Sequence, residues 1–144
     1  MRPRTRPRVF LDTNVLFSAL RTPGGKPRRV LQCATEGMVQ GTVSQVVLGE
    51  LARNLRRKAP YLIRDLEQLL IAATLEVVPE ALDDEIARWR DAGLGTDAPI
   101  VAAAVLAEVD YFCTGDRRLL EKASLMERAG LCVVAPGDLL EKLA

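Results

Sequence analysis

Short apolar segments alternate with longer helical segments along almost the whole chain, and this alternation is what most restricts its possible folds. The short segments predict strands, at residues 8–11, 38–43, 75–78, 110–114 and 131–134. The longer segments predict helices, at residues 13–20, 27–36, 45–58, 60–70, 98–107, 117–128 and 136–143, with one more through Ile86 and Trp89. This order is typical of a parallel sheet covered by helices on both faces. We therefore expect an α/β fold, a three-layer α/β/α sandwich around a central, mostly parallel sheet of four to five strands.

The 144-residue chain has the length of one domain. Before the first predicted strand, arginines alternate with Pro3 and Pro7, which favours an extended backbone. We expect residues 1–7 to form a flexible basic N-terminal arm and residues 8–144 to form a single domain. The sequence contains no run of about 18 apolar residues, the length that a membrane span needs.

The sequence contains no histidine and three cysteines. The absence of histidine excludes a Ser-His-Asp triad, a Cys-His pair and a His-ligated zinc ion. Cys33, Cys113 and Cys132 are widely separated and lie among apolar residues, which indicates reduced thiols in the core. Since reduced thiols are typical of a reducing compartment, we expect a cytoplasmic protein.

The formal net charge of +1 conceals a strong asymmetry along the chain. Residues 1–64 contain 13 Lys and Arg against 3 Asp and Glu, whereas residues 65–144 contain 7 against 16. Such a division indicates a basic surface for a polyanion beside an acidic region, although charge runs are more often simply solvated.

Three aspartates lie where predicted strands end or helices begin. Asp12 follows the first strand, Asp116 follows the fourth, and Asp97 lies at the start of the helix that leads into the fourth. Glu50 lies on the polar side of the helix after the second strand. Because binding sites in parallel sheets form at the carboxyl ends of strands, we expect the four carboxylates to face one site. Taken singly, each is more simply explained as a helix cap, a turn residue or a solvated acid.

Four converging carboxylates repel one another at neutral pH, so a cation is expected among them. With oxygen ligands alone, the site suits one or two Mg²⁺ or Mn²⁺ ions. Such ions activate water and neutralise charge that develops on a phosphodiester oxygen, which predicts metal-assisted hydrolysis.

Four segments of the sequence together resemble the successive motifs of PIN-domain proteins. They are Val-Phe-Leu-Asp-Thr-Asn-Val-Leu-Phe-Ser-Ala-Leu at 9–20, the helix with Ser44 and Glu50, Asp-Ala-Pro-Ile-Val-Ala-Ala-Ala at 97–104 and Asp-Tyr-Phe-Cys-Thr-Gly-Asp at 110–116. The resemblance extends over essentially the whole chain from Arg8. The continuation Leu-Arg-Thr-Pro-Gly-Gly at 20–25 is similar to the branch of VapC-type toxins of toxin–antitoxin pairs.

This resemblance implies a metal-dependent endoribonuclease that hydrolyses RNA phosphodiester bonds as the toxin of a toxin–antitoxin pair. Carried over by position, the catalytic and metal-binding residues are Asp12, Glu50, Asp97 and Asp116, and the residues that line the pocket are Asn14 and Thr114. The resemblance also implies Mg²⁺ or Mn²⁺ as cofactor, a small antitoxin protein as partner, and a homodimer. The apolar helix at residues 61–75 offers a self-association face for such a dimer.

An RNA that approaches an acidic pocket needs positive charge at the rim of that pocket. The residues expected to bind RNA are Arg53, Arg56 and Arg57, in the helix that carries Glu50, and Arg117 and Arg118, directly after Asp116. Aromatic residues make up only 4 % of the chain, so contacts to the RNA backbone are expected to dominate over base stacking.

Three other functions use a similar arrangement of acids. A haloacid-type phosphatase needs a second aspartate two residues after the first, where this chain has Asn14. A receiver-like signalling domain needs paired acids before the first helix and a lysine after the fifth strand, where the sequence reads Ala135-Pro136. The remaining alternative is a catalytically weak or inactive PIN-like protein that binds RNA or serves as a scaffold, and the presence of all four acids counts against it.

Overall fold

The five predicted strands pair into one sheet in a computed structural model that describes residues 6–144. The strands are β1 Arg8–Leu11, β2 Gln40–Val43, β3 Glu76–Val77, β4 Tyr111–Cys113 and β5 Cys132–Val134. Their order across the sheet is β3-β2-β1-β4-β5, and every neighbouring pair is parallel. The predicted parallel sheet of four to five strands is confirmed.

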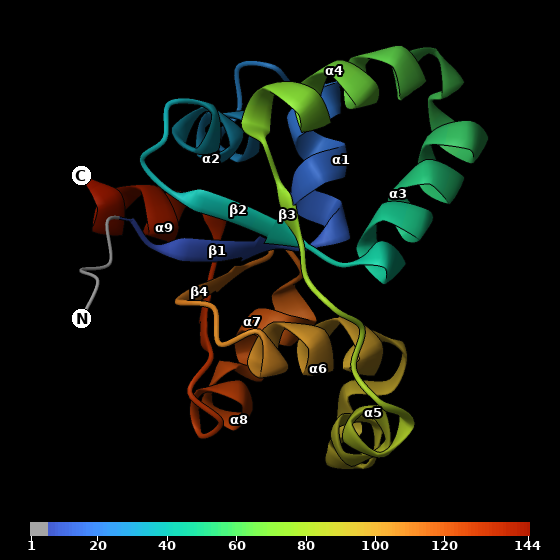
Figure 1. Cartoon of the computed structure of the whole chain (residues 1–144), viewed down its shortest axis with the longest axis vertical. Helices are drawn as coiled ribbons and strands as arrows, with labels where there is room; N and C mark the ends of the chain where they lie inside the picture. The colour runs from blue at the N-terminus through green and yellow to red at the C-terminus, as the bar shows by residue number, and fades with distance from the viewer. Residues whose placement is uncertain (1–5) are drawn as a thin grey trace.

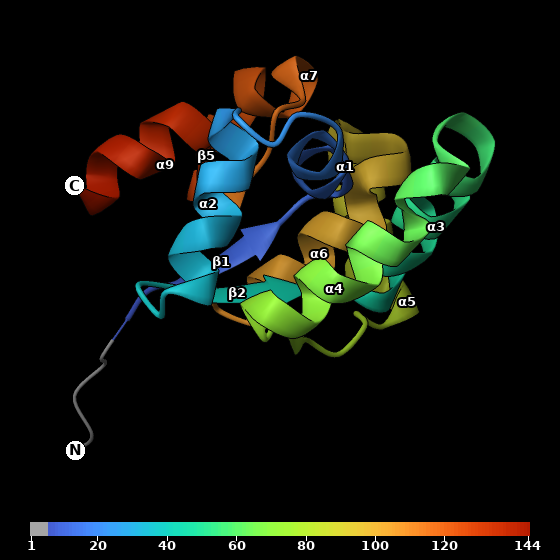
Figure 2. The ribbon, with the colours of Figure 1, turned by 90° about the horizontal axis from the view of Figure 1, so that it is seen from above.

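Helices cover both faces of this sheet, which gives the predicted three layers. Those on the first face are α1 Thr13–Arg21, α2 Lys26–Thr35, α3 Gln45–Lys58 and α4 Ile63–Ala73. Those on the second are α5 Asp83–Trp89, α6 Ala98–Leu106, α7 Arg117–Glu121 and α8 Ala123–Glu127. Figure 1 shows α1, α2 and α4 above the sheet and α5, α6 and α8 below it. The final helix, α9 Pro136–Leu143, packs against α2, as the view from above also shows (Figure 2).

The direction in which successive strands are added to the sheet reverses between β1 and β4, although the two strands are parallel. The chain first moves outward from β1 to β2 and β3, and then returns to the other side of β1 to form β4 and β5. The connections that leave β1 and β4 therefore depart on opposite faces, and a crevice opens at the carboxyl ends of these two strands. Asp12 directly follows β1, and the segment 114–116 directly follows β4.

The core lies between the sheet and the helices and is anchored by β1 and β4. Phe10 and Phe112, both fully buried, stack with their ring centroids 5.4 Å apart. The helix α6 consists of small and apolar residues, six of which are buried, whereas Leu106 at its end is exposed. The two strands that carry the acid positions are therefore fixed by packing on both faces of the sheet.

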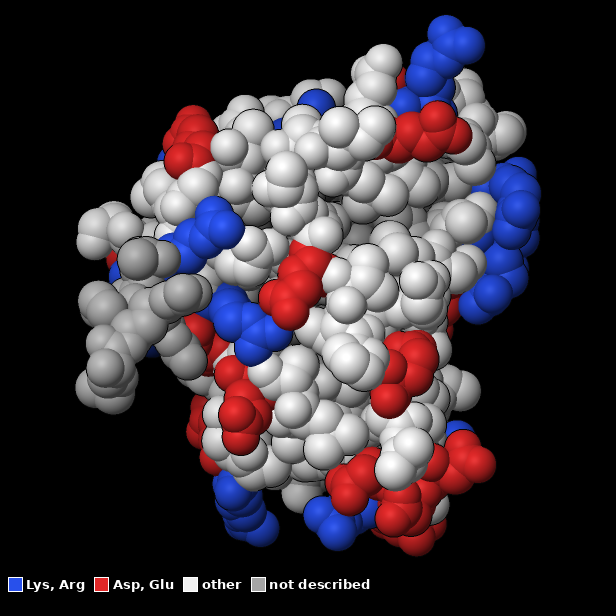
Figure 3. All heavy atoms as spheres, viewed as in Figure 1, with Lys and Arg blue, Asp and Glu red and all other residues white. Residues whose placement is uncertain are grey.

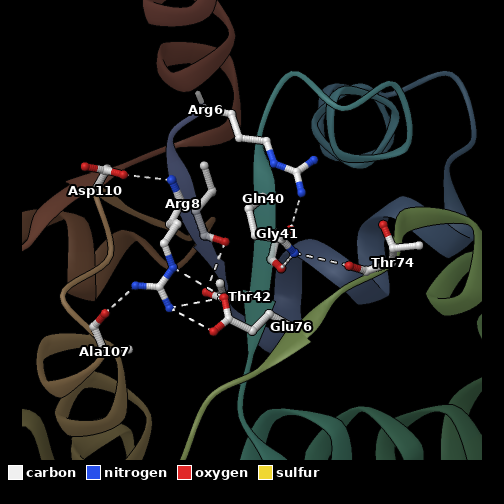
Figure 4. A network of polar contacts seen from close by, with 10 residues as sticks. Arg6, Arg8, Gln40, Gly41, Thr42, Thr74, Glu76, Ala107 and Asp110 are labelled. Carbon is white, nitrogen blue, oxygen red and sulfur yellow. Dashed lines mark hydrogen bonds and ion pairs between the residues drawn. The ribbon is translucent and has the colours of Figure 1, made fainter. Parts of the chain in front are cut away.

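The opposite, amino edge of the sheet is held by Arg8 (Figure 4). Its guanidinium donates to both carboxylate oxygens of Glu76 in β3 and to the carbonyl of Ala107, after α6. Its backbone N–H donates to Asp110 Oδ2 at 2.7 Å. This network connects three segments at the edge of the sheet that lies farthest from the acids.

The predicted basic arm at residues 1–7 is described only in its last two residues, and residues 1–5 lie outside the described part of the chain. Arg6 Nη2 donates to Gln40 Oε1 at 2.6 Å, and the Gln40 N–H donates to the Pro7 carbonyl at 2.8 Å. Residues 6 and 7 thus run alongside β2.

Several predicted boundaries differ from the structure. The helix predicted at 117–128 is two short helices, because the backbone leaves helical geometry at Lys122, with φ −101° and ψ 15°. The predicted strand at 38–43 begins only at Gln40. The predicted helix through Ile86 and Trp89 ends at Trp89 and is followed by a helical turn over Arg90–Leu94, in which Gly93 has a φ of 103°, a value that favours glycine. Within residues 6–144, no helix is both long and apolar enough to cross a membrane.

The three cysteines give a test of the core. Cys33 and Cys113 are buried and Cys132 is partly exposed, all as free thiols. Burial and the nearby Asp12 carboxylate raise the pKa of Cys113 to about 12, and burial also raises the pKa of Cys33. Since the thiolate is the reactive form, we expect one thiol per chain to react quickly with Ellman's reagent and two to react only after unfolding in guanidinium chloride. Fast reaction of all three in the folded protein would contradict this packing.

Candidate active site

The four predicted acids come together at the crevice beside β1 and β4. Asp12, Glu50, Asp97 and Asp116 all line one cavity of about 250 Å³, together with Asn14. Each acid comes from a different element: Asp12 precedes α1, Glu50 lies in α3, Asp97 precedes α6 and Asp116 precedes α7. Four elements that are distant in sequence thus supply carboxylates to one site.

Asp12 is held in place through both of its carboxylate oxygens. Oδ1 accepts the Thr13 N–H at 2.8 Å, so Asp12 also caps α1. Oδ2 accepts the Thr114 hydroxyl at 2.8 Å and the Asn14 amide at 3.1 Å. Asp12 is only 5 % exposed, so these contacts fix the orientation of a nearly buried carboxylate.

Thr114 and Asn14 link the end of β1 to the end of β4. The Thr114 hydroxyl donates to Asp12 and accepts the Asp116 N–H at 3.0 Å. Asn14 Oδ1 accepts the Gly115 N–H at 2.7 Å, and a Cβ on Gly115 would lie 3.1 Å from that oxygen. Asn14 lines the cavity as predicted in sequence, whereas Thr114 is fully buried behind the aspartates and does not itself line it. Thr114 acts here as a positioning residue.

Glu50 is held by a residue that sequence reasoning missed. The Thr13 hydroxyl donates to Glu50 Oε1 at 2.8 Å, which joins α1 to α3 across the cavity.

Asp116 accepts the Arg118 N–H at 2.9 Å and caps α7. Asp97 occupies the position before α6 without a capping hydrogen bond from its side chain. Asp97 therefore has no structural capping role in the described part of the chain.

The negative charges of the acids in this cavity repel one another. The pKa of Asp12 is raised to about 6, chiefly by burial and to a smaller extent by the charges of Asp97 and Glu50, against the lowering effect of its hydrogen bonds to Thr114 and Thr13. Burial also raises the pKa of Asp97, as do the charges of Asp116 and Glu50, while Arg118 and Lys122 lower it. An excess of negative charge that is costly to keep ionised indicates a site for a cation.

Comparison with known proteins places this chain in a family and shows which solved structures share its fold. The family model described as "PIN domain" matches residues 8–118, which carry all four acids. The chain belongs to the PIN-domain family. Among solved structures, PAE2754 from Pyrobaculum aerophilum is similar to this PIN domain with a TM-score of 0.70 and 18 % identity, covering 96 % of this chain and 98 % of that one. A chain in the structure of VapBC2 from Rickettsia felis, bound to a DNA fragment from its promoter, is similar with a TM-score of 0.65 and 16 % identity, covering 89 % and 98 %. No curated protein sequence gives a significant match.

Four further residues of this PIN domain line the cavity: Phe17, Ser18 and Asn54, which were not predicted from sequence, and Lys58, which the sequence places in one basic cluster with Arg53, Arg56 and Arg57. Helical spacing could have found them. Asn54 and Lys58 lie four and eight residues after Glu50, and Phe17 and Ser18 lie four residues after Thr13 and Asn14, so each group shares a helix face.

The arginines predicted to bind RNA lie around the cavity rather than in it. Arg53, Arg56 and Arg57 are exposed on α3 and do not line it. Arg118 lines an adjoining cavity of about 160 Å³ that shares Asp97 with the first, and its Nε lies 3.7 Å from Asp116 Oδ1. Arg117 is exposed at the start of α7. Figure 3 shows basic side chains over the α3 side of the PIN domain and acidic ones over the end where α5 lies.

The donor set of the cavity fits a hard divalent cation in chemistry. The residues that line it include four carboxylates and one lysine, and the other polar side chains are hydroxyls and amides. Oxygen donors of this kind are the ligands that such cations prefer. Within residues 6–144, however, no three Cys, Asp or Glu side chains are close enough together to form a ready-made metal cluster. The acids share a cavity but not a single coordination sphere, a spacing compatible with ligation partly through water.

Replacing Thr114 by valine should destabilise the PIN domain by about 2 kcal/mol, because it removes the shorter of the two hydrogen bonds to Asp12 Oδ2 and leaves the Asp116 N–H without its partner. Thr114→Ser keeps the hydroxyl and should lose less. Urea unfolding followed by circular dichroism measures both variants. Equal stability of Thr114→Val and wild type would show that the hydroxyl does not hold the two aspartates.

Proposed function

We propose that this PIN domain is a metal-dependent endoribonuclease that hydrolyses RNA phosphodiester bonds. The observation that carries this proposal is the cavity at the carboxyl ends of β1 and β4, where four carboxylates from four separate elements meet. One or two Mg²⁺ or Mn²⁺ ions would be held by Asp12, Glu50, Asp97 and Asp116. When bound, such an ion supplies an activated water and charge neutralisation at the phosphodiester.

The residues around the acids have separate tasks in this proposal. Thr114 and Asn14 keep Asp12 oriented, and Thr13 keeps Glu50 directed toward the same cavity. Since the chain has no histidine, the carboxylates are the side chains of the cavity best able to accept a proton from water near neutral pH. Arg53, Arg56, Arg57, Arg117 and Arg118 would attract the RNA backbone toward an otherwise repulsive site.

A role as the toxin of a toxin–antitoxin pair is part of this proposal, with a small antitoxin protein as partner and the cytoplasm as its location. The similarity to a chain of VapBC2, which was crystallised with promoter DNA, supports it at the level of the fold. We also propose a homodimer, supported by α4 and the turn before it, where Tyr61 is 76 % and Ile71 is 77 % exposed. Light scattering of the purified protein tests the dimer, and co-purification with the product of an adjacent gene tests the antitoxin.

A catalytically weak or inactive PIN-like protein that binds RNA or serves as a scaffold is the second candidate. The observation that favours it is that, within the described residues, no three acids are close enough together to form a ready-made metal cluster.

Cleavage of RNA distinguishes the two candidates. The purified protein is incubated with a pool of labelled single-stranded RNA in Mg²⁺, in Mn²⁺ and in EDTA. We expect cleavage with one or both cations, its loss in EDTA, and its return when the cation is restored in excess. Absence of cleavage with either cation, together with absence of cation binding by calorimetry, would favour the scaffold.

A further inference from the structure

The cavity extends beyond the acids along one face of α3. Glu50, Asn54 and Lys58 follow one another at intervals of four residues and all line it. At 1.5 Å per residue, Lys58 lies about 12 Å from Glu50 along the helix axis. Lys58 is therefore placed to meet a part of the ligand other than the part that reaches the acids.

An aromatic ring with two cations forms this distant end. The Arg21 guanidinium carbon lies 5.5 Å and the Lys58 Nζ 5.7 Å from the centroid of the Phe17 ring. Phe17 is the one aromatic residue among those that line the cavity, and it is only partly buried. Both cations lie over the partly exposed ring, so positive charge is concentrated at Phe17, and a base that stacks on the ring takes the place of one of them.

The polar groups at this end have spare bonding capacity. Among residues 6–144, no carboxylate lies within ion-pair distance of Lys58 or Arg21. In the same part of the chain, the side-chain amide of Asn54 has no hydrogen-bond partner. An aromatic face, an amide and an unpaired cation are the groups with which proteins bind single-stranded nucleic acid.

We propose that Phe17, Asn54 and Lys58 form a nucleotide subsite for single-stranded RNA at the end of the cavity away from the acids. The Phe17 ring stacks on a base, Lys58 binds a backbone phosphate, and Asn54 hydrogen-bonds to the same nucleotide. The role of this subsite rests on the proposed function: it positions the RNA strand so that a neighbouring phosphate lies at the four acids. It adds one specific base contact to the backbone contacts that are expected to dominate.

Two RNA probes separate the base contact from the phosphate contact. Fluorescence anisotropy measures binding of rU12, and of a 12-mer of abasic ribose phosphate, to the full chain in EDTA at low salt. Phe17→Leu should lower the affinity for rU12 by about 5- to 150-fold, as expected for one base–aromatic stack, without changing the affinity for the abasic oligomer. Phe17→Tyr keeps the ring and should bind rU12 as wild type does.

Lys58→Ala should weaken binding of both probes and reduce the slope of log K against log salt by about 0.7, as for one lost contact to a single strand. Lys142→Ala, an exposed lysine of α9, is the matched control and should leave affinity and slope nearly unchanged. Thermal unfolding of each variant checks that the fold is retained.

The outcomes distinguish this subsite from the proposed nuclease activity. Cleavage of RNA with wild-type KM in Phe17→Leu and Lys58→Ala would overturn the subsite and leave the nuclease standing. Binding that depends on Phe17 and Lys58 without any cleavage in Mg²⁺ or Mn²⁺ would support the subsite and overturn the nuclease. Equal loss of both probes in Phe17→Leu, or absence of RNA binding by the wild type, would overturn the subsite.

Discussion

Asp12→Asn is expected to lower the rate of RNA cleavage by at least about 100-fold while leaving the fold intact. Asp12 lines the cavity with three other carboxylates and is itself nearly buried. Water therefore has little access to this position and cannot easily take over the interaction that the Asp12 charge makes with a bound cation. Charge stabilisation by a bound cation contributes several kcal/mol to such a reaction. Since about 1.36 kcal/mol corresponds to a tenfold change in rate, weakening that interaction has a large effect.

The fold should survive this substitution because asparagine keeps part of the hydrogen bonding. Its Oδ1 can still accept the Thr13 N–H, so the cap of α1 is kept. The matched control is Asp138→Asn, which removes the charge of an exposed acid in α9. Initial rates on a labelled RNA, measured beside thermal unfolding, test both variants. A folded Asp12→Asn protein that cleaves at half the wild-type rate would show that Asp12 is not part of the catalytic site.

The sequence order was sufficient to predict the sheet and where its site lies. Each strand is a short apolar segment between longer helical ones, and the preference for a parallel sheet follows from that alternation. Asp12 and Asp116 could be placed because Asp12 directly follows β1 and Asp116 lies in the short segment after β4, and the carboxyl ends of parallel strands lie at one edge. These predictions depend on chain order and not on the angle at which elements pack.

Contacts that depend on how helices are rotated against each other could not be predicted. The hydrogen bond from the Thr13 hydroxyl to Glu50 requires α1 and α3 to present particular faces to each other. The same packing of α1 on α3 brings the Phe17 ring near Lys58. The low aromatic content indicated that backbone contacts dominate over base stacking, and composition does not say where a single ring lies. The break at Lys122 was also missed, since residues 117–128 contain neither Gly nor Pro. The packing of α8 on β5 overrides the local preference for one continuous helix.

The metal-free protein should become less stable as the pH rises from about 4 to about 7. The pKa of Asp12 is raised from 3.8 to about 6 in the folded protein, chiefly by burial. The folded state therefore holds this proton more tightly than the unfolded state does. Its stabilising contribution is complete below about pH 3.8 and is lost as the pH rises through about 6. At about 1.36 kcal/mol per pKa unit, the free energy of unfolding falls by about 3 kcal/mol across this range.

A divalent cation should oppose this loss at high pH. A ligand present at a hundredfold excess over its Kd stabilises the folded state by about 2.7 kcal/mol. The effect should be strong near pH 8, where Asp12 is ionised, and weak near pH 4, where binding would first have to displace its proton. Stabilisation that grows with pH in this way distinguishes binding at Asp12 from a general effect of ionic strength.

Urea unfolding in EDTA, in MgCl₂ and in MnCl₂ at several pH values measures both effects. Asp12→Asn is the matched variant, because it has no proton to lose at this position. It should show a shallower pH dependence in EDTA, with the raised pKa of Asp97 accounting for what remains, and a smaller gain from either cation. Identical pH curves for wild type and Asp12→Asn would show that Asp12 is ionised at no cost in the folded protein. The electrostatic argument for a cation in this cavity would then fail, even if the protein cleaves RNA.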